Sequence, residues 1–226
     1  MLSTPEAASD VFFDPEGGVL AGLSTGKNLV DCATLQVEDM QDMYSEAKAK
    51  GANFLEAPVS GSKVPAANGQ LVFLCGGDKD LFEAASADLA LMGKASHYLG
   101  PVGKGTQMKL VVNMVMSTML ASLAEGMSLT DALGLDSDAM IEILGQGAMA
   151  NPMFALKGPL MAKQSYAPNF PLKHAQKDMQ FALGLGDKVG QTLPVAAAAN
   201  SEYQRARGKH GDDDFSAVIE ALRSKP

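Results

Sequence analysis

The chain has 226 residues, of which 46% are hydrophobic and 19% are charged, and its formal net charge at pH 7 is −8. This is the composition of a globular protein, and the length allows one large domain or two smaller domains. Because the chain is acidic and has no cluster of Lys and Arg, we exclude a nucleic-acid partner. No basic and apolar leader follows Met1, so we expect a cytoplasmic protein; the alternative is a plastid or mitochondrial transit peptide in a segment that precedes Met1.

The first hundred residues alternate between strand and helix patterns. Val37 to Lys50 has helical spacing and ends at Gly51, a residue type that often caps the carboxyl end of a helix. Strands that alternate with helices indicate a mostly parallel sheet with helical crossovers. The predicted strands are 28–33, 53–57, 70–75 and 96–99, and the predicted helices are 37–50 and 79–92.

The cysteines and histidines carry no metal-binding pattern. Cys32 and Cys75 each lie in an apolar, strand-like run, where we expect buried and reduced thiols. The spacings among Cys32, Cys75, His97, His174 and His210 match no pair of metal-ligand spacings. The sequence therefore predicts no metal site.

After Gly105 the helix pattern dominates. Residues 108–133 carry apolar side chains on most faces, which is typical of a helix buried against several partners. Its apolar run, Leu110–Ala124, is shorter than the ~20 residues that a membrane span needs, so we predict no membrane association. Further helices are predicted at 137–144 with Asp136 as N-cap, at 171–207, and after Asp212–Asp214, the last one closing with Arg223 and Lys225.

The predicted fold class is therefore α/β followed by all-α. Residues 1–104 form the α/β domain, and residues 105–226 form an all-helical domain that begins with the long interdomain helix.

A string that resembles a dinucleotide-binding fingerprint lies at Gly145-Gln-Gly147-Ala-Met-Ala150. The fingerprint requires a preceding strand, because its glycines form the turn from a strand into a helix. Here a predicted helix precedes the string. We interpret it as the end of that helix, and we interpret Gly184-Leu-Gly186 as a site of close helix packing.

Two short segments contain residues suited to chemistry. Lys109 and Asn113 lie one turn apart on the same face of the long helix, and a polar pair on an apolar face is costly unless it is used. The alternative is a lysine that reaches solvent from the start of the helix. Pro58–Lys63 follows a strand, and its Ser-Gly-Ser turn offers backbone N–H groups and two hydroxyls to a carboxylate. The alternative is an ordinary turn.

A third polar segment, Pro171–Met179, contains His174, Lys177 and Asp178, and taken alone it indicates an exposed helix face. Taken together, however, these segments resemble the β-hydroxyacid dehydrogenases, the relatives of 3-hydroxyisobutyrate dehydrogenase, and within them the plant-type glyoxylate/succinic semialdehyde reductases. The resemblance extends from Met1 to near the carboxyl end. It rests on Ala57–Ser62, Gly105–Asn113, Asn151–Phe154, Phe170–His174, Lys177–Met179 and Asp214–Val218.

The resemblance implies an oxidoreductase that reduces small aldehyde acids, glyoxylate or succinic semialdehyde, to hydroxy acids by hydride transfer from NADPH. It implies that Lys109 is the catalytic residue. It also implies a Rossmann-like domain and a helical domain that builds homo-oligomers. The substrate-binding residues that it implies are Ser60, Gly61, Ser62, Asn113, Phe170 and Asp178, and the cofactor-binding residues are Thr34 and Lys177.

The chain departs from the family pattern at its amino-terminal end. In the family, about two βαβ units with the glycine-rich turn for the pyrophosphate precede the segment that Met1–Pro5 resembles, which is the end of a fourth strand. We therefore expect a truncated Rossmann-like domain with an exposed sheet edge and impaired activity. The alternative is a non-catalytic fragment that acts through oligomerisation or binding. The related 6-phosphogluconate dehydrogenases have a histidine where this chain has Val112, which argues against that family.

Overall fold

The computed structural model describes residues 1–223, and they form two compact units. The first unit is Met1–Val112 and the second begins at Asn113, so the boundary falls within the long helix α6 (Lys104–Ala132). The domain boundary proposed between residues 104 and 105 lies at the start of this helix and stays a prediction. The predicted class, α/β followed by all-α, is confirmed.

The first unit contains a five-stranded sheet in which β1, β2, β4 and β3 are neighbours in that order and β5 pairs with β4. β1–β2 and β4–β5 are parallel, whereas β2–β4 and β3–β4 are antiparallel. The sheet is therefore mixed: the two longer pairings are parallel, as predicted, and the two shorter ones are antiparallel, which was not predicted. The chain between β2 and β4 holds no long helix that would carry it across the sheet, so it turns back instead. The strands are β1 (Asn28–Asp31), β2 (Asn53–Glu56), β3 (Val59–Ser60), β4 (Leu71–Gly77) and β5 (Gly93–Tyr98).

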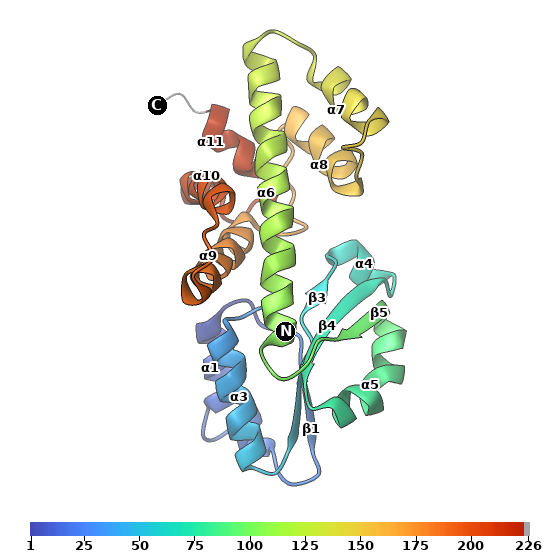
Figure 1. Ribbon diagram of the computed structural model, residues 1–226, viewed down its shortest axis with the longest axis vertical. Helices are drawn as coiled ribbons and strands as arrows, with labels where there is room; N and C mark the ends of the chain where they lie inside the picture. Colours follow the sequence, from blue (N-terminus) through green and yellow to red (C-terminus); the bar gives the residue numbers. More distant parts are fainter. Residues whose placement is uncertain (224–226) are drawn as a thin grey trace. The chain divides into compact units, whose positions relative to one another are not determined.

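Helices cover both faces of this sheet (Figure 1). Successive side chains of a strand point to opposite faces. In β2, Phe54 packs in an apolar cluster with Met40 and Met43, whereas Leu55 packs in a second cluster with Leu81. α1 and α3 therefore lie over the Phe54 face, and α5 lies over the Leu55 face. The helices of the first unit are α1 (Pro5–Phe13), α2 (Val19–Gly22), α3 (Val37–Ala49), α4 (Lys63–Ala67) and α5 (Lys79–Met92).

Most predicted elements of the first unit are confirmed. The helix predicted at 79–92 has the same bounds as α5, and Gly51 follows α3 with a positive φ of 75°. β5 begins at Gly93, earlier than expected. The residues before Pro5 are not a strand, because Thr4 is the N-cap of α1 and its side chain accepts a hydrogen bond from the N–H of Ala7 at 3.2 Å.

The second unit is helical. The helix predicted at 171–207 is two helices, because Gly190 follows the first with a positive φ of 69° and Pro194 starts the second. Tyr203 is fully buried in the core, and its hydroxyl donates to the carbonyl oxygen of Ser117 at 3.1 Å. α9 and α10 lie side by side (Figure 1). The elements are α7 (Ser137–Gln146), α8 (Pro152–Ala162), α9 (Leu172–Val189), α10 (Pro194–His210), a 3₁₀ helix η1 (Phe215–Ile219) and α11 (Glu220–Arg223).

Several predictions on helix ends in the second unit have clear outcomes. Asp136 caps α7 as predicted, since its side chain accepts from the N–H of Asp138. Gly147 ends α7, so the glycine string there is a helix end and not a phosphate loop. Gly186 is a close-packing site as predicted, because a Cβ atom there would lie 2.7 Å from the carbonyl oxygen of Gln191. The same prediction is wrong for Gly184, where a Cβ atom would have open space around it. The predicted closing residue Lys225 lies outside the described residues.

Helix α6 is not buried on all sides, so that prediction is wrong. In the second unit, Leu120, Leu123 and Met127 face the core, but Val115 and Met119 are 49% and 37% exposed. Apolar side chains therefore cover more of the helix surface than the core buries. Among the described residues, α6 is one helix that is long and apolar enough to cross a membrane, a property that it shares with core helices of soluble proteins.

A buried carboxylate, Asp214, holds together distant parts of the second unit. Lys157 Nζ lies 2.7 Å from its Oδ1, and both side chains are nearly inaccessible to solvent. The same carboxylate accepts hydrogen bonds from the backbone N–H groups of Asn169, Phe170 and Ser216. Burial raises the pKa of Asp214, but the hydrogen bonds from Lys157 and Ser216 outweigh it, so the pKa lies below its usual value.

We expect the substitution Asp214→Ala to lower the free energy of unfolding by about 3–5 kcal/mol, because it leaves the Lys157 ammonium buried without its carboxylate. The difference from the parent protein is fully present above pH 3.8, the usual value for this group, and it shrinks as the pH falls through the lowered native pKa. Urea unfolding followed by circular dichroism measures this difference. The control is Asp212→Ala, whose side chain is 89% exposed and whose loss should change stability by less than about 0.5 kcal/mol. Equal effects of the two substitutions would contradict the assignment.

Candidate active site

The Ser-Gly-Ser turn leaves the sheet at the end of β3. Gly61 has a positive φ of 125°, and a Cβ atom there would lie 2.9 Å from Cδ2 of Leu71, so only glycine suits this position. Ser62 precedes α4, but its hydroxyl makes no capping hydrogen bond. Gly61 and Ser62 are exposed and Ser60 is half-buried, so the turn presents its polar groups to solvent.

Thr34 follows β1, the strand that pairs with β2. Because β1 and β2 are parallel, their carboxyl ends meet at one edge of the sheet, where the N–H of Ala57 donates to the carbonyl oxygen of Asp31 at 2.7 Å. Thr34 and the Ser60–Ser62 turn both follow this edge in the sequence. The carboxyl edge of such a sheet is the usual position of ligands in α/β proteins.

Lys109 lies in the second turn of α6 and is 7% exposed. The start of the helix is bound by a residue that the sequence analysis missed, Glu56 at the end of β2. Its carboxylate accepts hydrogen bonds from the N–H groups of Gly103 and Gly105 and from the hydroxyl of Thr106. Burial raises the pKa of Glu56, and these donors partly offset the rise. The one signal in the sequence is an acidic residue at the end of an apolar strand.

Three of the predicted residues form one cluster in the second unit. The Asn113 amide Nδ2 donates to Asp178 Oδ2 at 2.7 Å, and both side chains are buried. Lys177 Nζ lies 3.3 Å from Asp178 Oδ1 and 5.2 Å from the centre of the Phe181 ring. The Asp178 carboxylate thus holds an amide on α6 and an ammonium on α9.

Phe170 is placed by its backbone. Its N–H donates to Asp214 Oδ2 at 3.3 Å, and its carbonyl oxygen accepts from the N–H of Phe215 at 2.8 Å. The rings of Phe170 and Phe215 meet edge to face with 5.5 Å between their centres. The half-buried ring is therefore fixed at the start of α9.

The pKa of His174 is shifted by its surroundings. Burial lowers its pKa, and the nearby ammonium groups of Lys177 and Lys173 lower it further. The imidazole is therefore neutral at pH 7.

The described residues show no metal-binding cluster and no disulfide. Among residues 1–223, no group of three or more His, Cys, Asp or Glu side chains could hold a metal ion. Cys32 and Cys75 are both free thiols, as expected, although Cys32 is only half-buried. Burial raises the pKa of Cys75 to about 12, so this thiol is not a nucleophile at neutral pH.

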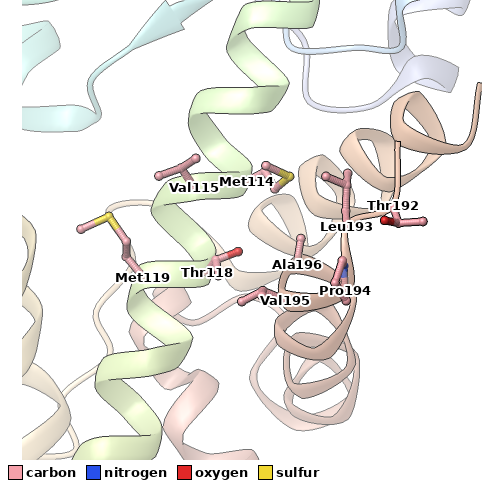
Figure 2. Close-up of a pocket in the computed structure, with 9 residues that line it drawn as sticks. All are labelled: Met114, Val115, Thr118, Met119, Thr192, Leu193, Pro194, Val195 and Ala196. Atoms are coloured by element: carbon pink, nitrogen blue, oxygen red, sulfur yellow. The ribbon is translucent and has the colours of Figure 1, made fainter. Parts of the chain in front are cut away.

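A cavity of about 310 Å³ lies in the second unit between α6 and residues 192–196 (Figure 2). Its lining is mostly apolar, and the Thr118 side chain points from α6 towards the 192–196 segment. The described residues that line this cavity differ from all the predicted site residues. The lining residues are Met114, Val115, Thr118, Met119 and Thr192 to Ala196.

Two family models cover nearly the whole chain. Residues 103–222 match the model described as the NAD-binding domain of NADP-dependent 3-hydroxyisobutyrate dehydrogenase. Residues 1–100 match the model described as the NAD binding domain of 6-phosphogluconate dehydrogenase. These matches cover the sheet of the first unit and the helices of the second, and they define a class of nicotinamide-cofactor dehydrogenases.

Known proteins narrow this class. The chain is 52% identical to glyoxylate/succinic semialdehyde reductase 2, chloroplastic, and 51% identical to glyoxylate/succinic semialdehyde reductase 1, both of Arabidopsis thaliana, over 99% of its residues. It spans 63% and 77% of the length of these two relatives. The structure of Mycobacterium tuberculosis 3-hydroxyisobutyrate dehydrogenase with L-serine matches 99% of the chain and 78% of that protein, with a TM-score of 0.86 and 28% identity.

The chain belongs to the 3-hydroxyisobutyrate dehydrogenase-like family of β-hydroxyacid dehydrogenases, as its sequence predicted.

Proposed function

We propose that the protein reduces small aldehyde acids, glyoxylate or succinic semialdehyde, to the corresponding hydroxy acids with NADPH. The observation that carries this proposal is the buried Lys109 near the start of α6, in a chain about half identical to two plant reductases named for these substrates. In the proposed reaction an ammonium at this position stabilises the negative charge that develops on the substrate oxygen.

The chemistry asks two things of the chain's own residues. When hydride reaches the aldehyde carbon, negative charge develops on the oxygen, and the Lys109 ammonium donates a hydrogen bond or a proton to that atom. The Ser60–Gly61–Ser62 turn holds the substrate carboxylate with its hydroxyls and backbone N–H groups. Two observations support this role. Gly61 is exposed, and the Ser62 side chain makes no capping hydrogen bond to α4.

The remaining predicted residues have supporting roles in the proposal. Asn113 orients the substrate, braced by Asp178, and Phe170 shapes the site. Thr34 and Lys177 contact the cofactor, which supplies the hydride when bound. The fit is supported by the position of Thr34 after the carboxyl edge of β1 and by the partly exposed ammonium of Lys177.

We expect Lys109→Ala to lower kcat by at least about a hundredfold, because general acid catalysis by a side chain typically contributes 10²–10⁴-fold. The measurement is NADPH oxidation with glyoxylate and with succinic semialdehyde, together with circular dichroism to verify the fold. Lys104→Ala, which removes an exposed lysine from the same helix, is the control and should keep its kcat. A near-normal kcat of the Lys109 variant would reject its catalytic role.

Cofactor binding separates the reductase from the alternative of a non-catalytic fragment. We expect NADPH to bind the 226-residue polypeptide saturably, with a Kd below about 1 mM, as read from nicotinamide fluorescence. Lys177→Ala should weaken this binding at least about threefold, since an ammonium near a phosphate-bearing ligand favours it. Lys173→Ala, one turn earlier on α9, should leave it unchanged. Binding that does not saturate at millimolar NADPH would favour the fragment.

We also propose that the protein is a homo-oligomer. The supporting observation is an apolar surface in the second unit formed by Val115, Met119 and Val195, which border the cavity of Figure 2. Exposed apolar patches commonly mark protein contacts. A second copy of this chain is the occupant that we propose.

Sedimentation velocity tests the oligomer. We expect Val115→Asp to shift the protein towards the monomer, because an unpaired carboxylate would be buried in the contact. Leu91→Asp, at a residue of the first unit that is 82% exposed, is the matched control and should sediment like the parent. A parent protein that is monomeric at all concentrations would contradict the proposal.

A further inference from the structure

We propose that Glu56 is a positioning residue, which fixes the Lys109 ammonium by fastening the start of α6 to the sheet of the first unit. The functional part of this inference rests on the role proposed for Lys109. The contacts of Glu56 stand independently of that role.

Both oxygens of the Glu56 carboxylate are engaged. Oε1 accepts from the N–H of Gly103 at 2.7 Å and from the N–H of Gly105 at 2.8 Å, and Oε2 accepts from the hydroxyl of Thr106 at 2.6 Å. The first N–H groups of a helix have no partner within the helix, so a carboxylate here acts as a cap supplied by another strand. Its charge also suits the positive end of the helix dipole.

The packing around this carboxylate leaves no room for a shift. Gly76 lies opposite Glu56 in the β2–β4 ladder, and a Cβ atom at Gly76 would lie 2.5 Å from Glu56 Oε1. A Cβ atom at Gly105 would lie 2.3 Å from the carbonyl oxygen of Leu74. Two glycines thus let the helix start and β4 touch backbone to backbone. The carboxylate lies between them.

This fastening controls the position of Lys109. Thr106 and Lys109 are three residues apart and therefore share a face of α6, one turn from each other. Thr106 is fully buried, and its hydroxyl is held by Glu56. A small rotation or slide of the helix start would move the ammonium with it.

Glu56 and the Ser60 turn are connected through the same strand, β4. β4 pairs with Glu56 through Gly76 and with Ser60 through Val72. The strand that the helix start touches is therefore the strand that holds the turn. Lys109 and Ser60 are both tied to β4, one through Glu56 and one through the β3–β4 ladder.

The test measures the environment of Lys109 without requiring turnover. The folded protein is treated with an amine-acylating reagent, and mass spectrometry gives the acylation rate of Lys109 relative to that of Lys94, an exposed lysine of β5. We expect Glu56→Ala to raise this ratio at least about tenfold, because a frayed helix start opens more often. Glu56→Gln, which keeps the acceptor for both backbone N–H groups, should stay within about threefold of the parent protein.

Two further variants separate positioning from general instability. Ala47→Gly weakens α3, a different helix of the first unit, and should leave the ratio within about threefold. Should Glu56→Ala fail to fold, Thr106→Val removes one of the three hydrogen bonds and should raise the ratio about three- to tenfold. An unchanged ratio in the folded Glu56→Ala or Thr106→Val variant would overturn the inference, as would an equal rise in Ala47→Gly.

This outcome is distinct from that of the proposed function. If Lys109→Ala keeps its turnover while Glu56→Ala raises Lys109 acylation, the fastening holds and the catalytic role of Lys109 fails. If Lys109→Ala loses turnover while the acylation ratio of Glu56→Ala stays unchanged, the catalytic role holds and the positioning role of Glu56 fails.

Discussion

The hydrogen bonds of one buried carboxylate, Glu56, join the sheet of the first unit to the start of α6. These contacts place the first turns of α6 within the first unit, where Thr106 and Lys109 lie. Three short hydrogen bonds to the Glu56 carboxylate offset the cost of burying its charge. Two of the donors are backbone N–H groups that would have no partner within the helix. The position proposed for the Lys109 ammonium rests on these contacts within the first unit.

In the second unit a different buried carboxylate, Asp214, also binds several donors. Asp214 accepts from backbone N–H groups at the start of α9 and of η1 and pairs with Lys157 on α8. In both units an acidic side chain gathers backbone donors from segments that are distant in sequence. Asp178 pairs with side chains instead: its Oδ2 accepts from the Asn113 amide of α6, and its Oδ1 lies 3.3 Å from the ammonium of the adjacent Lys177. Glu56 and Asp214, two buried carboxylates with several donors, therefore each join distant segments within one unit.

Local patterns in the sequence predicted much of the fold and the family. The spacing of apolar residues gave the bounds of α5, and six short segments indicated the family that the comparisons confirm. The antiparallel return of β4 was missed, because alternation of strands and helices does not reveal strand direction. The exposed side of α6 was missed, because composition does not tell how many partners a helix has. Glu56 was missed, because its donors lie 47 to 50 residues further along the chain.

The way in which Phe170 is held has a consequence for the evolution of substrate choice. Asp214 binds the main chain of residues 169 and 170, whereas the aromatic side chain of Phe170 contacts the ring of Phe215 and packs against the core. A different side chain at position 170 would keep the hydrogen bonds that anchor the loop. If Phe170 shapes the site as proposed, a mutation there would change the shape offered to a substrate while the backbone anchor of the loop remains, at the cost of the packing that the ring contributes.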